Sequence, residues 1–277
     1  MARLAYLFDS SKCVGCHGCQ IACKQWNEEQ ATRTTFTGSY QNPPSLSPDT
    51  RTIMRFYENF EQDTIPQLNI LKVQCYHCGE PACVKVCPSG ALSKTDKGIT
   101  AVDAAKCIAC GYCHSACPFT VPAIGKHVNK CDMCFSRTEH GDDKQKTSTP
   151  ACVKTCPAGA LEFGDRDALV AKAHKRVDWL KTRGHKDANL YGEKVLGGLG
   201  VMSVLKYPPA SYGLPANPTM PLELFVWKDL FNPMGLLMLA GAVGAAAGHY
   251  LLARRQARDD HHHHGGDDSK GKEEMKG

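Results

Sequence analysis

Sixteen cysteines confined to four short motifs limit what this chain can fold into more than any other feature of its sequence. The motifs are Cys13, Cys16, Cys19 and Cys23 (motif 1); Cys75, Cys78, Cys83 and Cys87 (motif 2); Cys107, Cys110, Cys113 and Cys117 (motif 3); and Cys131, Cys134, Cys152 and Cys156 (motif 4). Disulfide frameworks occur mainly in smaller secreted chains and need no such regular spacing. The spacing therefore predicts thiolates that converge on metal centres.

The spacing within the motifs is that of iron–sulfur proteins. Motifs 1 and 3 read C-x2-C-x2-C-x3-C, motif 2 reads C-x2-C-x4-C-x3-C, and proline follows Cys87, Cys117 and Cys156. In bacterial ferredoxins the fourth cysteine of such a run ligates the other cluster of a pair. Four motifs therefore predict four 4Fe-4S clusters in two pairs.

Motifs 2 and 3 are separated by only nineteen residues, as in a small two-cluster ferredoxin, which leaves motif 1 to pair with motif 4. The predicted iron ligands are Cys13, Cys16, Cys19 and Cys156; Cys23, Cys131, Cys134 and Cys152; Cys75, Cys78, Cys83 and Cys117; and Cys87, Cys107, Cys110 and Cys113. The alternative is a zinc-stabilised membrane scaffold. A four-cysteine zinc site needs only two CxxC pairs, so the further cysteines of each motif would be surplus.

An internal repeat predicts the fold. Residues 10–23 resemble 104–117, and residues 80–92 resemble 149–161. Each copy of the second unit runs into a short apolar segment that predicts a strand, and residues 97–102 predict the hairpin partner of the first. We therefore expect an α+β fold with two ferredoxin-like two-cluster modules in residues 1–164. A further strand is expected within residues 51–60.

The rest of the chain divides by composition. Residues 165–184 predict an amphipathic helix capped by Asp165 and ended by Gly184. Residues 185–232 are rich in Gly, Pro and Tyr near their start, show no sustained period, and predict an extended tether.

Residues 233–253 contain no Asp, Glu, Lys or Arg and are long enough to cross a bilayer as one helix. Residues 254–277 are polar and predict a disordered tail. Arg254, Arg255 and Arg258 follow the span, whereas Lys228 alone shortly precedes it. By the positive-inside rule the C-terminus is cytoplasmic, and the cysteine domain lies on the periplasmic side of the inner membrane.

The N-terminal residues resemble neither a signal peptide nor a twin-arginine signal. Export would therefore require a partner that carries the signal.

Lys12, Lys106 and Lys130 each precede the first cysteine of a motif, where a cation would raise a cluster potential. Solvated lysines without that role are the equal alternative. The histidines within the motifs are expected not to be ligands.

Neither a phosphate-binding glycine loop nor a nucleophile–base pair occurs, and no aromatic-basic stripe suggests nucleic acid. Clusters without a substrate site predict a non-catalytic electron relay.

Several segments carry a resemblance to a known family. CVGCHGCQIACKQWN (13–27), CIACGYCHSACPF (107–119) and PACVKTCPAGALEFG (150–164) resemble the four-cluster electron-transfer subunits of molybdopterin oxidoreductases. TIMRF (52–56), LKTRG (180–184), GGLGVMSVL (197–205) and YGLPANP (212–218), followed by one span, are similar to the iron–sulfur (beta) subunit of respiratory membrane-bound formate dehydrogenase of the N type.

The resemblance implies a place in an electron-transfer complex. It implies a molybdopterin or tungstopterin catalytic subunit, which in that family carries the twin-arginine signal, and a cytochrome b subunit that passes electrons to the quinone pool. The alternative is the same relay in a membrane hydrogenase or a sulfur-compound reductase.

Overall fold

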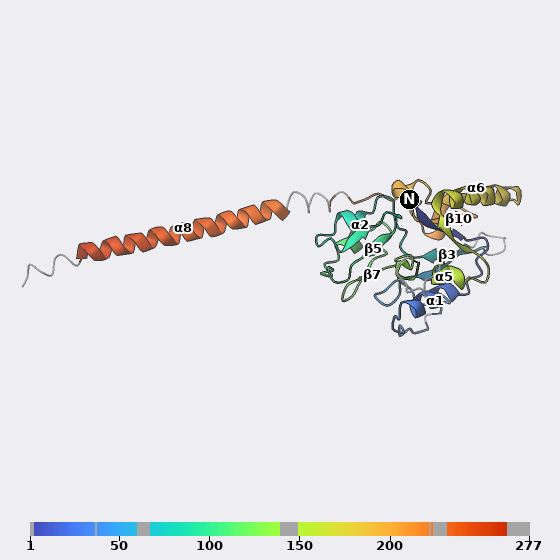
Figure 1. Cartoon of the computed structure of the whole chain (residues 1–277), viewed down its shortest axis with the longest axis horizontal. Coiled ribbons are helices and arrows are strands. Elements are labelled where there is room, and N and C mark those ends of the chain that lie inside the picture. The colour runs from blue at the N-terminus through green and yellow to red at the C-terminus, as the bar shows by residue number, and fades with distance from the viewer. Residues whose placement is uncertain are drawn as a thin grey trace, which may run out of the picture. The chain divides into compact units, whose positions relative to one another are not determined.

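The computed structural model describes residues 3–36, 38–59, 67–138, 149–221, 223 and 232–264. The chain divides into two units, Met1–Pro221 and Leu222–Gly277. The first unit contains all four cysteine motifs, and the second contains the long helix α8 (Asn232–His264) (Figure 1).

A four-stranded sheet, in the order β8-β1-β10-β9, forms the framework of the first unit. At its centre β1 (Leu4–Asp9) lies parallel to β10 (Val201–Leu205), with Tyr6 opposite Val201. The outer strands β8 (Leu161–Asp165) and β9 (Asn189–Tyr191) are antiparallel to their neighbours. The sheet thus joins the N-terminus to segments that lie far along the chain.

The two faces of this sheet are buried against different layers. On one face Ala5, Leu7, Met202 and Val204 pack with the helix α6 (Arg166–Thr182). On the other face Tyr6 and its neighbours belong to the core that contains motif cysteines. Because successive strand residues point to opposite faces, β1 connects the helix layer with the cysteine layer.

The predicted amphipathic helix is confirmed as α6. The Asp165 carboxylate accepts hydrogen bonds from the backbone N–H groups of Asp167 (3.1 Å) and Ala168 (3.0 Å), so it satisfies two donors that the first helical turn leaves free. The helix ends at Thr182, and Gly184 follows with φ +95°.

Three small hairpins and several short helices surround the motifs. The hairpins are β2 (Ile53–Asn59) with β3 (Gln67–Val73), β4 (Leu92–Lys94) with β5 (Thr100–Val102), and β6 (Ala123–Ile124) with β7 (Val128–Asn129). The strand expected within 51–60 and the hairpin after motif 2 are thereby confirmed.

The short helices are α1 (Gly18–Trp26), α2 (Ala82–Lys85), α3 (Tyr112–Ser115), α4 (Phe135–Thr138) and α5 (Ala151–Lys154), with 3-10 turns η1 (Val195–Gly197) and η2 (Pro209–Tyr212). Among them α1 contacts α5, and α2 contacts α3. The helix of motif 1 therefore packs on that of motif 4, and the helix of motif 2 on that of motif 3.

The extended tether predicted for residues 185–232 is wrong for its first part. Residues 189–191 and 201–205 form β9 and β10, and all five residues of β10 are buried. A strand buried on both faces is a continuous apolar run without alternation, which is why no period marked it. The first unit accordingly extends to Pro221 and not to residue 164.

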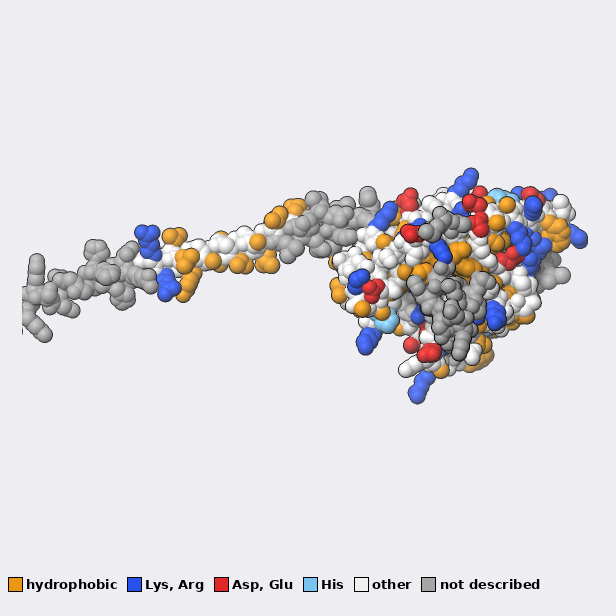
Figure 2. Space-filling view, in the orientation of Figure 1, with side chains coloured by type: hydrophobic (Ala, Val, Ile, Leu, Met, Phe, Trp, Pro, Cys, Tyr) orange, Lys and Arg blue, Asp and Glu red, His pale blue; other side chains and the backbone are white. Residues whose placement is uncertain are grey.

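The second unit contains one helix that is long and apolar enough to cross a membrane, at Leu237–Gln256, and none of that window is buried. Figure 2 shows hydrophobic and uncharged atoms along most of its described length, with basic side chains toward its C-terminal end. The helix continues to His264, so residues 254–264 are helical and not disordered as predicted. Leu, Ala, Arg and Gln are good helix formers, which favours this continuation. Residues 265–277 and Lys228 lie outside the described residues.

Candidate iron–sulfur cluster sites

Every motif contains the same backbone turn. The residue before the second cysteine of each CxxC pair has a positive φ: Gly15 (67°), His77 (46°), Ala109 (53°) and Met133 (57°). This left-handed conformation costs side-chain-bearing residues about 1–3 kcal/mol. It turns the chain so that both cysteines of the pair face the same side. At Gly15 a side chain is also excluded by space, because a Cβ atom would lie 2.7 Å from the Phe56 ring.

Two groups of four cysteines line pockets, and each group combines two motifs. Site I is lined by Cys13, Cys16, Cys19 and Cys156. Site IV is lined by Cys87, Cys107, Cys110 and Cys113. In each site three cysteines come from one motif and the fourth from its partner motif.

For three of the other eight cysteines, the cysteines that influence the thiol belong to one predicted ligand group. The thiol of Cys78 is influenced most, among charged neighbours, by Cys75, Cys117 and Cys83. Cys131 is influenced by Cys23 and Cys152, and Cys134 also by Cys152. We name these groups site II (Cys23, Cys131, Cys134 and Cys152) and site III (Cys75, Cys78, Cys83 and Cys117). The assignment of these four groups as iron ligands, made from the spacing, stays a prediction.

Burial makes these thiols hard to ionise. Desolvation raises the pKa of Cys19 to about 11 and those of Cys23 and Cys83 to about 12, and neighbouring cysteines add to the shift. Cys87 is an exception: burial opposes ionisation, but the backbone N–H groups of Leu92 and nearby residues lower its pKa. Buried thiols at this density carry negative charge only if cations replace their protons, as iron does.

Hydrogen-bond donors are oriented toward the sulfur atoms. The backbone N–H groups of Val128 and Ala160 donate to Cys107 Sγ and Cys156 Sγ, each at 3.3 Å. Gln74 Nε2 and His77 Nε2 are buried and have no hydrogen-bond partner among the described residues. Sulfur atoms of a bound cluster could accept from such donors, so the donor set fits an iron–sulfur cluster.

The described cysteines form neither disulfides nor a compact site for a single metal ion. All sixteen cysteines lie in the described part of the chain, and none forms a disulfide. Among the described residues no group of three or more Cys, His, Asp or Glu side chains is placed to hold a metal ion.

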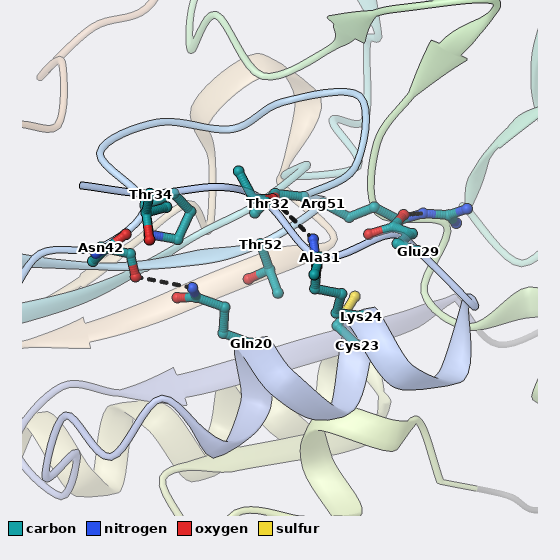
Figure 3. Close-up of a pocket in the computed structure, with 12 residues that line it drawn as sticks. Gln20, Cys23, Lys24, Glu29, Ala31, Thr32, Thr34, Asn42, Arg51 and Thr52 are labelled. Atoms are coloured by element: carbon teal, nitrogen blue, oxygen red, sulfur yellow. Dashed lines mark hydrogen bonds and ion pairs between the residues drawn. The ribbon is translucent and has the colours of Figure 1, made fainter.

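The helix α1, which carries Cys19 and Cys23, is held by polar contacts around a cavity of about 360 Å³ (Figure 3). Gln20 Nε2 donates to Asn42 O at 3.2 Å, and Lys24 Nζ donates to Thr32 Oγ1 at 3.0 Å. Figure 3 shows Cys23 on the helix turn next to Lys24, at the wall of this cavity. These contacts fix the helix that brings one cysteine to site I and the other to site II.

Of the three lysines that precede the motifs, only Lys130 is buried. Its Nζ donates to Cys131 O at 3.1 Å and to Thr100 O. Lys12 and Lys106 are partly exposed, and each pairs with the Asp three residues earlier. Solvent screens such charges, so the role predicted for a lysine near a cluster suits Lys130 best.

Sequence reasoning missed a further buried cation, Lys72 in β3, which is 2% exposed. Burial alone would lower its pKa, but Cys152, Cys19 and other motif cysteines raise it. The available signal was a single lysine inside the apolar run LNILKV, directly before motif 2.

The histidines of the motifs have protein partners. His17 Nδ1 lies 3.3 Å from Gln20 Oε1, and His114 Nδ1 lies 2.6 Å from Pro122 O. His77 Nδ1 accepts from the backbone N–H of Thr100 at 3.0 Å. That the histidines are not ligands stays a prediction.

Comparison with known proteins connects these sites to a family. Two 4Fe-4S dicluster domain families match residues 12–91 and 66–166. The formate dehydrogenase-O iron–sulfur subunit of Escherichia coli is 38% identical over 251 residues, which is 88% of this chain and 81% of the relative. The formate dehydrogenase iron–sulfur subunit of Haemophilus influenzae is 39% identical over 247 residues, 86% of this chain and 77% of the relative.

The chain belongs to the formate dehydrogenase iron–sulfur subunits. The family described as formate dehydrogenase N, transmembrane, matches residues 223–263, which include the candidate span. A probable anaerobic dimethyl sulfoxide reductase chain of Escherichia coli is 37% identical but matches only 61% of this chain. The sulfur-compound reductase alternative is therefore not favoured. The predicted fold class, with two ferredoxin-like 4Fe-4S domains and a C-terminal candidate membrane helix, is confirmed.

Proposed function

We propose that sites I to IV each hold one 4Fe-4S cluster and that the subunit relays electrons without catalysing a reaction itself. Each cluster would supply one-electron chemistry. The sixteen cysteines supply the iron ligands in the four groups given above. The observation that carries the proposal is the exchange of the fourth cysteine between motifs at sites I and IV.

The contacts between sites support a linear order. Cys113 of site IV raises the pKa of Cys83 in site III, and Lys130 lowers it. Lys130 also donates a hydrogen bond to the backbone carbonyl of Cys131 in site II. Cys152 of site II acts on Cys19 of site I. Neighbouring sites are thus IV with III, III with II, and II with I.

The two end sites are open to partners. Cys16 of site I and Cys110 of site IV are the exposed cysteines among the sixteen. Val14 and Ile108, at equivalent positions of the repeat, are exposed beside them by 66% and 65%. An exposed apolar side chain beside an accessible end of the relay suits docking of another redox protein.

The two end sites differ in their relation to the last residues of the first unit. The first unit ends at Pro221, and Met220 Sδ lies 3.8 Å from Lys85 Nζ, next to α2 and motif 2. Met220 therefore lies beside the helix of motif 2, whose cysteines belong to sites III and IV. We assign site IV to a membrane cytochrome b subunit that passes electrons to quinone, and site I to a molybdopterin or tungstopterin catalytic subunit.

The decisive test of this function is formate-dependent dye reduction by the complex purified from detergent-solubilised membranes. We expect a brown fraction that oxidises formate and contains a large pterin-binding subunit and a cytochrome b. A brown complex that is inert to formate would contradict the formate dehydrogenase role and leave only the relay. A colourless preparation would contradict the clusters as well.

We further propose that the first unit lies on the periplasmic side of the inner membrane and the C-terminus in the cytoplasm, because Arg254 and Arg255 lie at the C-terminal end of the Leu237–Gln256 window. Protease added to intact spheroplasts should digest the first unit and spare an epitope at the C-terminus. Protection of the first unit until the membrane is lysed would reverse this orientation.

A further inference from the structure

Lys72 lies on the strand face that contacts motif 1. In the β2–β3 hairpin it is directly opposite Met54, and Ile70, two residues earlier, is opposite Phe56. Directly paired residues and residues two apart in a strand share a face. Met54 Sδ accepts a hydrogen bond from Cys19 Sγ at 3.4 Å, and Phe56 and Ile70 border the backbone at Gly15.

The ammonium group of Lys72 is influenced by two sites at once. The cysteines that act on it most are Cys152, Cys19, Cys131 and Cys23. Cys19 belongs to site I, and the other three belong to site II. The lysine therefore lies within electrostatic reach of both sites.

Few described protein groups offset the positive charge of Lys72. Its side chain donates to Gln74 Oε1, and Gln74 is neutral and 1% exposed. No ion pair between Lys72 and a carboxylate is found among the described residues. An uncompensated buried charge is strongly unfavourable, so the anionic partners that justify it are to be sought in the two adjacent sites.

We infer that Lys72 is a fixed positive charge shared by sites I and II, which favours the reduced clusters there and limits the repulsion between two reduced neighbours. The inference rests on the proposed cluster content. Reduction adds a negative charge to a cluster, so a nearby buried cation stabilises the reduced form in both sites. Lys72 thus influences the clusters through its positive charge and is not an iron ligand.

The test is a redox titration of the purified complex followed by electron paramagnetic resonance, with iron content measured in parallel. In Lys72→Met we expect the ratio of reduced to oxidised form, at a fixed potential, to fall about tenfold for two of the four clusters. That change corresponds to a midpoint potential lower by about 59 mV for one electron. Lys72→Arg should keep both midpoint potentials close to wild type. Lys106→Met, which removes an exposed lysine paired with Asp103, is the matched control and should move no cluster as far.

Gln74→Glu provides a second variant if Lys72→Met does not assemble its clusters. It keeps the lysine but places a carboxylate against the ammonium, so the same two midpoints should fall. The inference would be overturned if Lys72→Met or Gln74→Glu had full iron content and four unchanged midpoint potentials. It would also be overturned if Lys72→Arg shifted the midpoint potentials as much as Lys72→Met. Wild-type complex without cluster signals would instead contradict the proposed function.

Discussion

Replacing Cys117 by serine is expected to remove the same cluster as replacing Cys78, although the two residues belong to different motifs. Cys117 acts electrostatically on Cys78 and Cys83 across the α2–α3 contact. Loss of either thiolate leaves site III with three ligands. Each variant should therefore lose about a quarter of the iron bound by this subunit and the same paramagnetic signal, because four equivalent clusters share that iron.

Functional assays of these variants should separate the relay from the catalytic step. Site III lies between sites IV and II in the proposed order, so electron transfer from formate to quinone should stop in both variants. Formate-dependent reduction of a dye that accepts electrons directly from the catalytic subunit should continue. Ser115→Ala, on the exposed surface of α3, is the matched control and should retain all iron.

The corresponding exchange at site IV completes the experiment. Cys87→Ser should match Cys110→Ser, since both residues line the same cavity. If Cys117→Ser instead reproduced the spectrum of Cys110→Ser, each motif would keep its own fourth cysteine, and the assignment of sites III and IV would be wrong.

Introducing arginine at Val243 and Ala246 is expected to release the subunit from the membrane when it is expressed without its membrane partner. Both positions lie in the central part of the Leu237–Gln256 window, and both are exposed. An arginine at the centre of a membrane helix costs roughly 2.5–3.5 kcal/mol, so the pair costs about 5–7 kcal/mol. That change is sufficient to oppose insertion of a helix that is only moderately hydrophobic.

Extraction of membranes at alkaline pH measures this effect. The double variant should move to the soluble fraction, whereas Gln256→Arg, which introduces the same side chain at the end of the window, should stay with the membrane. Iron content should be unchanged in both, because the motifs belong to the first unit. Retention of the double variant in the membrane pellet would show that α8 is not the anchor.

Much of the candidate site could be predicted because its information is local. The spacing of the cysteines indicated 4Fe-4S chemistry, and two 4Fe-4S dicluster domain families match the residues that contain the motifs. The hairpin after motif 2 and the cap at Asp165 also depend on residues close in sequence. Patterns that are satisfied within one turn or one hairpin are visible before the chain is folded.

Other features depended on distant partners. β10 has no alternating pattern of its own and becomes a central strand only because β1, almost two hundred residues earlier, pairs with it. Lys72 is an ordinary lysine in the sequence and becomes a buried cation only when β2, motif 1 and motif 4 close around it.

The sequence by itself therefore determined the chemistry of this protein: sixteen thiolates at iron–sulfur spacing and one apolar segment long enough to span a membrane. The tertiary structure decided which charges face the clusters, which two cysteines remain exposed, and which strands hold the sites together. The physical reason is that ligand type and hydrophobic length are local properties, whereas burial and electrostatic environment are set by residues far apart in the chain.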